Sequence, residues 1–477
     1  MVFKETDQYV NVAIVGGGFC GILTAIHLLR DKESQLHVHL INKDGTLTKG
    51  VAYNPHTASL LLNVPNGRMS AFDDVPDDYV QWLLKNYPQE KNKTNLAAAF
   101  SSRQQYGEYL ACLWAETCSR PGANKQISIY NQRADDIVED AGLLHIHLED
   151  NSVVKAKAII LATGNRLPRL PDGIHPYFKN SSYYFGDPWD SACVNHTNNE
   201  SDILVIGNGL TMVDTVTGLV ENGFKGNIYT VSPHGYRLRP STDAKAPYTG
   251  LNPAKIADTS LLNLVKTLNK HRKIAEGLNQ SPYPLIDALR PHSQKLWQSF
   301  SLNEKRQFTR YLRFFWDNIR HRLPVELYNL INDMRNSGQL ITQKGQITAI
   351  TETGCGLEVT LNCCGSLKPI SVQRIINCTG PETDINQPGN ELLNNLVKKG
   401  MINAGPCGIG INAQPENGRV ITDRHLQQPH LFIIGGNLKG VLWESTAVPE
   451  LRAQAKNIAG HLLTVICTQQ GHIIEPV

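Results

Sequence analysis

Apolar and polar positions follow a strand, turn and helix pattern near the start of the chain. Val12–Val15 are all apolar, Gly16–Gly21 read Gly-Gly-Gly-Phe-Cys-Gly, and an amphipathic run then continues to Leu29. A short apolar run bounded by glycines is typical of a buried strand, and the spacing of apolar residues after it is typical of a helix. The pattern therefore predicts a βα unit built around a glycine turn.

The glycines of this turn have the spacing of a dinucleotide-binding fingerprint. Gly16 permits a tight turn, Gly18 lets the backbone approach a pyrophosphate, and Gly21 lets the helix pack closely on the strand. The start of the helix would direct free N–H groups and the positive end of its dipole at the phosphates. An ordinary tight βα turn is the alternative, but the flanking strand and helix favour a nucleotide site.

The pattern occurs a second time. The apolar run Ile203–Ile206 precedes Gly207-Asn208-Gly209-Leu210-Thr211, and the residues after this turn are helical in character. Each unit is followed later by short β-type runs and by a buried strand ending in Thr-Gly, at Thr163-Gly164 and at Thr379-Gly380. This internal duplication suits two nucleotides, one in each unit.

Two positions depart from the fingerprint. Asn42 stands at the end of the predicted strand Leu36–Ile41, where an acid usually binds the ribose hydroxyls. Asn42 can still hydrogen-bond a ribose hydroxyl. In the second turn Met212 replaces the third glycine, which predicts a helix lying farther from its strand and leaves a weak or vestigial nucleotide site open.

Basic residues follow the predicted strand Asn227–Val231 of the second unit. Arg237 and Arg239 lie where guanidinium groups would suit the 2′-phosphate of NADP. Solvated surface arginines explain them equally well. The preference between NADPH and NADH therefore stays open at this point.

Residues 242–336 are expected to be mostly helical. Within them Lys305–Arg322 should form one helix with an apolar stripe facing the core, made of Phe308, Leu312, Phe315 and Ile319. Arg320-His321-Arg322 could meet an anionic substrate or a cofactor phosphate, although a solvated helix end is the more ordinary interpretation.

Two further stretches are expected near a cofactor. Gly50–Ser70 is rich in Gly, Pro and Asn but also carries Tyr53, and it could lie along a flavin ring or form a structural excursion. The apolar run Leu431–Ile434 is followed by Gly435-Gly436-Asn437, and a long helix is expected over Glu444–Leu463. The start of that helix would direct its N–H groups at the pyrimidine end of a flavin.

Composition limits the class of protein. A chain of 477 residues is long enough for two or three domains, and a net charge of +3 gives no large field for nucleic acid. No apolar run reaches the length of a membrane helix, and Met1–Val10 lacks the features of a signal peptide, so a cytoplasmic protein is expected. The ten cysteines lack CxxC spacing and the sixteen histidines lack metal-binding spacing, which argues against a zinc site or a redox dithiol.

With these residues in view, the chain resembles the two-dinucleotide-binding-domain flavoproteins, and among them the bacterial FAD/NAD(P)-binding oxidoreductases. The resemblance covers nearly the whole chain. The segments that carry it are GGGFCG (16–21), GVAYN (50–54), LLNVPNGRMS (61–70), ATGN (162–165), DPWD (187–190), GNGLTMVD (207–214), RHRLP (320–324), NCTGP (377–381) and LWESTAVPELRAQA (442–455). More distantly, the chain is similar to flavin-dependent N-hydroxylating and Baeyer–Villiger monooxygenases, in which NADPH reduces FAD and the reduced flavin activates oxygen.

The resemblance implies an α/β fold with two Rossmann-like dinucleotide-binding domains, each with a β-meander insertion and the second with the helical insertion 242–336. Residues 1–190 and 366–477 would form the FAD-binding domain, and residues 200–365 the NAD(P)H-binding domain. The residues expected to contact FAD or NAD(P)H are Gly16, Gly18, Phe19, Cys20, Gly21, Asn42, Lys43, Tyr53, Asn63, Thr163, Gly164, Gly207, Gly209, Thr211, Arg237, Arg239, Gly436 and Asn437.

The expected function is that of an FAD-dependent oxidoreductase in which NADPH or NADH reduces the flavin, acting as a monooxygenase on a small molecule. Two alternatives stay open: an oxidase or dehydrogenase that does not use NAD(P)H, and a non-catalytic flavin-binding sensor. A nucleic-acid partner, a metal ion and an integral membrane association are not expected. No general acid or base can be named, because neither His56 nor His321 has a partner apparent in the sequence.

Overall fold

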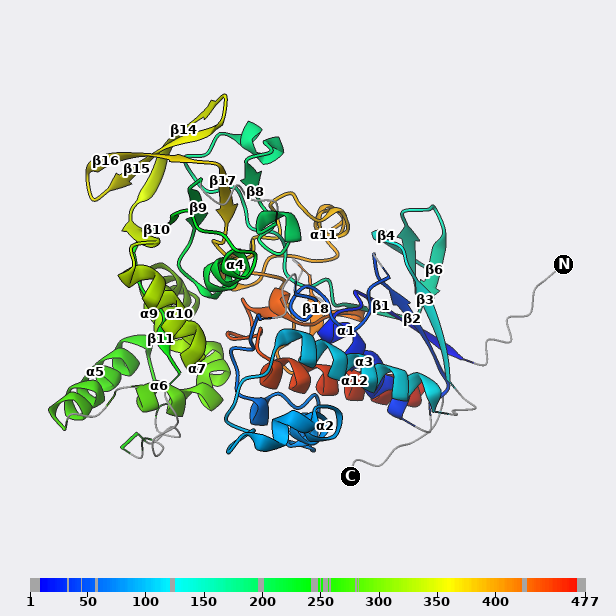
Figure 1. The fold of residues 1–477 in the computed structure, drawn as a ribbon. Coiled ribbons are helices and arrows are strands. Elements are labelled where there is room, and N and C mark those ends of the chain that lie inside the picture. Colours follow the sequence, from blue (N-terminus) through cyan, green and yellow to red (C-terminus); the bar gives the residue numbers. More distant parts are fainter. Residues whose placement is uncertain are drawn as a thin grey trace.

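A computed structural model describes residues 9–31, 34–43, 45–55, 59–120, 125–195, 201–241, 248, 250–251, 256, 259–278, 281, 283–422 and 427–469. Two parallel sheets, two three-stranded meanders and a helical insertion make up the described part of the chain, and Figure 1 shows them as separate layers. The expected α/β class is therefore confirmed.

The first sheet has six strands in the order β18, β19, β7, β1, β2, β3. All neighbours pair in parallel except β18 and β19, which are antiparallel. The strands are β1 (Val10–Val15), β2 (Leu36–Ile41), β3 (Lys125–Tyr130), β7 (Ala158–Leu161), β18 (Arg419–Ile421) and β19 (Gln427–Ile433).

Alternating side chains of β1 explain how this sheet is covered. Val12 and Ile14 face a core formed with α1, α3 and α12, whereas Ala13 and Val15 face a core formed with a meander and α11. The meander consists of β4 (Ala134–Asp140), β5 (Leu143–Leu148) and β6 (Val153–Ala156), and the helices are α1 (Phe19–Arg30), α3 (Arg103–Ser119), α11 (Glu391–Lys398) and α12 (Val448–Gln469). The connection from β2 to α3 contains α2 (Asp78–Asn86).

The second sheet repeats this plan. Its five strands run in parallel in the order β13, β10, β9, β17, β8. Helices α4 and α10 cover one face and the second meander covers the other. The elements are β8 (Tyr184–Phe185), β9 (Ile203–Ile206), α4 (Leu210–Glu221), β10 (Ile228–Ser232), α10 (Val325–Asn336), β13 (Leu340–Lys344), β14 (Gln346–Thr353), β15 (Gly356–Cys363), β16 (Ser366–Val372) and β17 (Arg374–Asn377).

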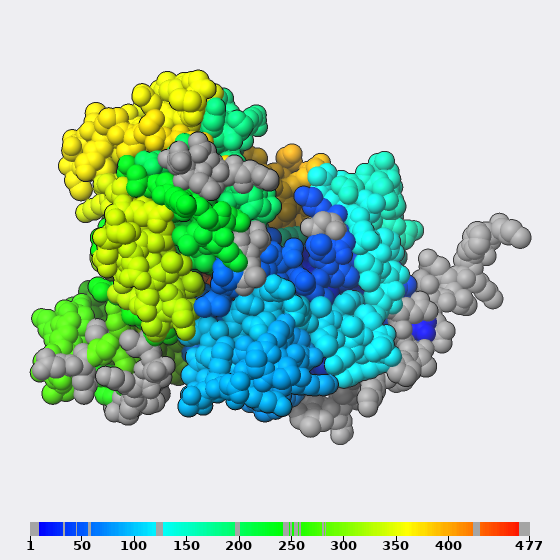
Figure 2. All heavy atoms as spheres, in the orientation of Figure 1, coloured from blue at the N-terminus to red at the C-terminus, as the bar shows by residue number. Residues whose placement is uncertain are grey.

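The helical insertion lies beside the second sheet at the lower left of Figure 1. Its own core includes Trp297 and Phe308, and Ile409 and Trp443 from the C-terminal part of the chain join that core. The insertion therefore packs against the first unit, and the space-filling view shows the two halves in contact along the middle of the molecule (Figure 2). Its elements are β11 (Arg239–Pro240), α5 (Leu261–Gly277), α6 (Tyr283–Leu289), α7 (Ser293–Ser299), α8 (Leu302–Gln307), α9 (Arg313–Arg320) and β12 (Arg322–Leu323).

The helix expected over Lys305–Arg322 is not continuous. A π-helical segment, Phe308–Leu312, separates α8 from α9, and the chain leaves helical geometry at His321. Because a π turn holds an extra residue, the apolar stripe moves on by one position. Trp316 joins the core in place of Phe315, whose surface is 46% exposed.

The other expected long helix starts later than the sequence suggested. Glu444 has a left-handed backbone with φ of +70°, and α12 begins only at Val448. The Ser445 hydroxyl donates to the carbonyl of Gly435 at 2.8 Å, which holds this stretch against the end of β19. The first four residues of the expected helix therefore form a loop.

The strand pairing does not place a domain boundary between residues 365 and 366, where one was expected. Gly365, with φ of +93°, lies between β15 and β16, which pair as a hairpin. Strand β17 then pairs with β9, and β8 pairs with β17 at the edge of the same sheet. Residues 184–185 and 366–377 therefore belong to the second unit.

Candidate functional site

The first glycine turn is shaped by two backbone contacts. Gly16 has φ of +113°, and a Cβ there would lie 2.2 Å from the carbonyl oxygen of Ala162 at the end of β7. A Cβ on Gly21 would lie 1.9 Å from the carbonyl oxygen of Gly16. Around Gly18 the nearest atom to a Cβ is 3.6 Å away, on Gly50. The turn is thus closed on its protein side and has room at Gly18.

Helix α1 starts directly after this turn. Its N-cap residue is Gly18, no side chain caps it, and its first turn holds no acidic residue. In α3, by contrast, Ser102 and Gln105 form a capping box. The first N–H groups of a helix need acceptors, and a phosphate is a natural one.

Asn42 braces the glycine turn. Its Oδ1 accepts a hydrogen bond from the backbone N–H of Gly17 at 2.9 Å, and its Nδ2 donates to the carbonyl of Thr46 at 3.1 Å. The neighbouring Lys43 is exposed. The residue expected at the ribose thus also holds the turn in place.

The Phe19 side chain is buried, and that of Cys20 is half-buried. The Phe19 ring packs edge-on to Tyr53, with centroids 6.1 Å apart. Burial raises the pKa of the Cys20 thiol to about 12, so it stays protonated at neutral pH. Backbone N–H groups are what these two residues can offer a cofactor.

The ends of β7 and β19 are tied together beside the turn. Asn437 donates from Nδ2 to Thr163 Oγ1 at 3.1 Å and to the carbonyl of Gly164 at 3.2 Å. Gly436 fits closely here, because a Cβ on it would lie 2.2 Å from Oδ1 of Asn165. The structure therefore brings together the expected residues Gly16, Thr163, Gly164, Gly436 and Asn437.

A cavity of about 190 Å³ lies between the first unit and the helical insertion. Tyr53 and Asn63, both expected from the sequence, line the cavity together with Met69 and Val448. Its ionisable lining residues, called the charged wall, are Arg103, Asp317, Arg320, His321, Arg322, Lys439 and Glu444. The segment 320–322 is therefore part of the cavity wall, so the interpretation as a solvated helix end is wrong.

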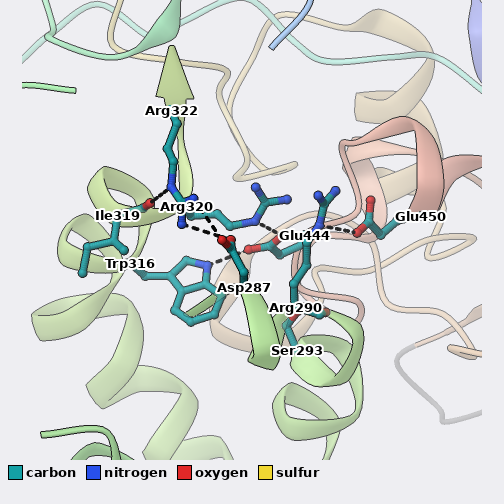
Figure 3. A network of polar contacts seen from close by, with 9 residues as sticks. All are labelled: Asp287, Arg290, Ser293, Trp316, Ile319, Arg320, Arg322, Glu444 and Glu450. Carbon is teal, nitrogen blue, oxygen red and sulfur yellow. Dashed lines mark hydrogen bonds and ion pairs between the residues drawn. The ribbon is translucent and has the colours of Figure 1, made fainter. Parts of the chain in front are cut away.

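Ion pairs hold the insertion to the first unit at this wall (Figure 3). Glu444 accepts from Arg320 Nε at 2.9 Å and from Trp316 Nε1 at 2.7 Å. Arg290 Nε lies 3.4 Å from Glu450 Oε1 at the start of α12. A further hydrogen bond runs from Trp297 Nε1 to the carbonyl of Gly440 at 2.8 Å. These bonds fix the loop that precedes α12.

Removal of the Glu444 carboxylate should test this junction. The side chains of Arg320 and Glu444 are only 16% and 9% exposed, so Glu444→Ala leaves a buried guanidinium unpaired and should destabilise the protein by about 3 kcal/mol. Thermal unfolding measures the effect. Asp172→Ala is the matched control, because its ion pair with Arg169 is exposed and should contribute less than about 1 kcal/mol. Equal melting temperatures for the two variants would contradict the expected role of Glu444.

The second glycine turn copies the first in part. Gly207 has φ of +111°, and a Cβ there would lie 2.4 Å from the carbonyl oxygen of Cys378 at the end of β17. A Cβ on Gly209 would meet nothing within 4 Å, and Thr211 follows in the first turn of α4. Met212, at the place of the third glycine, is buried in the core of the second unit. The larger helix-to-strand spacing expected from it stays a prediction.

Arg237 and Arg239 are exposed on either side of the buried Leu238. Among the described residues neither arginine forms an ion pair. Next to them His234 stacks on Phe314, with ring centroids 3.9 Å apart. The pair of arginines is thus available for an anionic ligand.

Sequence reasoning missed the charged wall apart from 320–322. Arg103 and the neighbouring residues Lys439 and Glu444 lie far from 317–322 in the sequence and reach the cavity through tertiary packing. The signal that could have found Glu444 is the segment LWESTAVPELRAQA, in which it lies. His56 lies outside the described residues. No helix among the described residues is long and apolar enough to cross a membrane, and no cluster of metal-binding side chains occurs among them.

Comparisons with known proteins agree with this arrangement. Residues 13–166 match the FAD-NAD(P)-binding family model. A search of curated protein sequences gave no significant match.

The fold occurs in solved flavoenzymes. Ornithine N-hydroxylase from Kutzneria sp. 744, solved with reduced FAD, NADP⁺ and L-ornithine, superposes with a TM-score of 0.66 at 14% identity over 97% of this chain and 100% of its own. Ornithine hydroxylase from Pseudomonas aeruginosa gives 0.66 at 17% identity over 96% and 99% of the two chains. L-lysine 6-monooxygenase from Pseudomonas syringae gives 0.64 at 15% identity over 96% and 99%. The chain therefore has the fold of flavin-dependent N-hydroxylating monooxygenases, and the resemblance seen in the sequence is confirmed.

Proposed function

We propose that the protein is an FAD-dependent NAD(P)H oxidoreductase that acts as a monooxygenase on a small molecule. The observation that carries the proposal is the duplicated glycine turn, in which Gly16 and Gly207 each lie against the last carbonyl of a central parallel strand. The fold is similar to that of ornithine hydroxylase over 96% of the chain, which supports the same proposed function.

The first unit fits FAD. Its uncapped α1 and the room at Gly18 suit a pyrophosphate. Asn42 and the exposed Lys43 lie where the adenosine ribose would bind. The flavin ring would reach the cavity along Tyr53 and Asn63, where Val448 at the start of α12 also lines it. Bound FAD would accept a hydride from NAD(P)H and pass electrons to oxygen.

The second unit fits a nicotinamide dinucleotide. Helix α4 also begins without a side-chain cap, and Gly209 leaves open space at its start. Thr211 lies in the first turn of this helix, where its hydroxyl can serve a phosphate. Arg237 and Arg239 would bind the 2′-phosphate of NADPH, because guanidinium groups bind phosphate bidentately.

The chain's own residues prepare the cavity for the reaction. Trp443 and Met69 cover part of its wall and exclude water. Glu444, held by two donors, fixes the loop before α12. The start of α12 does not supply the free N–H groups expected from the sequence, because Pro449 has no N–H and the N–H groups of Glu450 and Leu451 donate to the carbonyl of Ala447. Burial lowers the pKa of His321, so its imidazole is neutral at pH 7 and can accept a proton.

Anaerobic titration of the purified protein with NADPH and then NADH tests the proposal. We expect the visible flavin band to bleach at stoichiometric NADPH. NADH should bind at least about tenfold more weakly, because it lacks the phosphate that Arg237 and Arg239 would hold. A flavin band that neither nucleotide bleaches would overturn the proposal and favour an oxidase or a sensor.

A further inference from the structure

The charged side chains around the cavity differ in whether they already have an ion-pair partner. Of the two carboxylates of its wall, Glu444 accepts hydrogen bonds from Arg320 and Trp316, whereas Asp317 Oδ2 lies 3.6 Å from Arg313 Nε in a partly exposed ion pair. A cationic ligand would therefore have to compete with an arginine for either acid.

Two of the cationic side chains are engaged as well. Arg103 Nη2 lies 2.9 Å from Asp214 Oδ2, and both side chains are almost completely buried. Arg322 binds Asp287 through two parallel hydrogen bonds of 2.9 and 3.0 Å. Such bidentate pairs are strong and are not readily given up to a ligand.

Lys439 differs from the other cations of the wall. Its ammonium has no ion pair or hydrogen-bond partner among the residues that the structure describes, and it lies 4.8 Å from the ring centroid of Trp443. Burial lowers its pKa, as expected for an ammonium with too few partners. Asp317 and Glu444 act on it only from a distance.

We propose that Lys439 receives an anionic group, such as a carboxylate, of the small-molecule substrate. This inference rests on the proposed function, since it assigns a substrate class to the same cavity. A half-buried ammonium that lines a cavity beside an aromatic ring gains a charge-assisted hydrogen bond when a carboxylate enters. An amine would have to compete with Arg320 for Glu444 and with Arg313 for Asp317.

Three probes with the same ring test the substrate class: benzoate, benzylamine and benzyl alcohol. A cavity of about 150 Å³ holds benzene in another protein, so a ring of this size fits 190 Å³. Binding is followed by tryptophan fluorescence, to which Trp443 in the wall responds, and by the absorption of bound flavin. Benzoate should bind at least about tenfold more tightly than the other two. Tightest binding of benzylamine would overturn the proposal.

Substitution of the lysine tests the residue. Lys439→Met should weaken benzoate binding at least about tenfold and leave benzyl alcohol binding unchanged, whereas Lys439→Arg should keep the preference for benzoate. Lys305→Met is the matched control, because the Lys305 ammonium lies 5.6 Å from the Trp297 ring but does not line the cavity. Unchanged benzoate binding in the Lys439→Met protein would overturn the role of Lys439.

The outcomes of these binding tests do not depend on whether the proposed function is correct. Binding is measured without NAD(P)H, so benzoate selectivity that depends on Lys439 would stand even if neither nucleotide reduced the flavin. Conversely, a protein that NADPH reduces but that prefers benzylamine would keep the oxidoreductase function and lose the anion site. If Lys439→Met does not fold, the preference of the unmodified protein among the three probes tests whether the cavity selects an anion.

Discussion

The Gly21→Ala protein is expected to bind FAD at least about tenfold more weakly and to lose about 3 kcal/mol of stability. The reason is steric: the new methyl group would lie 1.9 Å from the backbone oxygen of Gly16. Backbone atoms cannot rotate away, so α1 must shift from β1, and its N-terminus would leave the place where a phosphate binds. Flavin content of the purified protein and thermal unfolding measure the two effects.

Gly460→Ala is the control for this experiment. Gly460 lies inside α12, and a Cβ there would meet nothing within 4 Å. Alanine favours a helix over glycine by up to about 1 kcal/mol, so the control should keep its flavin and melt at the same or a higher temperature. A Gly21→Ala protein with full flavin content would show that close packing of α1 is not needed for the cofactor.

The Gly209→Leu protein is expected to fold normally, to keep its FAD and to bind NADPH at least about tenfold more weakly. A Cβ on Gly209 meets no atom within 4 Å, so the protein tolerates a side chain, whereas a pyrophosphate approaching the turn would not. Anaerobic titration with NADPH gives the affinity, and thermal unfolding verifies the fold.

Gly277→Leu serves as the control here, since Gly277 ends α5 and also has empty space around it. It should leave NADPH binding unchanged. Normal reduction of the Gly209→Leu protein by NADPH would show that the second turn does not hold the nucleotide. That result would favour the oxidase and sensor alternatives.

Local patterns were enough to predict the elements around the two turns. The strand expected at Val12–Val15 is observed as Val10–Val15, and the strand expected at Leu36–Ile41 is observed with these bounds. The duplication was also predictable, because each strand and glycine turn lies within about ten residues and needs no distant partner to be recognised. What these turns bind stays a prediction.

Features that depend on distant contacts were not predictable. The π segment Phe308–Leu312 changes which residues face the core, and no local pattern distinguishes it from an α-helix. The charged wall arises because Glu444 meets Arg320, 124 residues away in the chain. Such pairs follow from the packing of the insertion on the first unit. Sequence periodicity carries no information about that packing.

The first sheet contains strands from both ends of the chain, so it cannot be completed until late in synthesis. Strand β7 pairs with β19, whose residues leave the ribosome long after β17 has completed the second sheet. The second unit can therefore fold while the first sheet still lacks β18 and β19. Helix α12, which helps to cover the face formed by Val12 and Ile14, arrives last. Domains generally fold as units during synthesis, and late long-range pairing is slow. The nascent chain must keep that apolar face shielded until its C-terminal segment emerges.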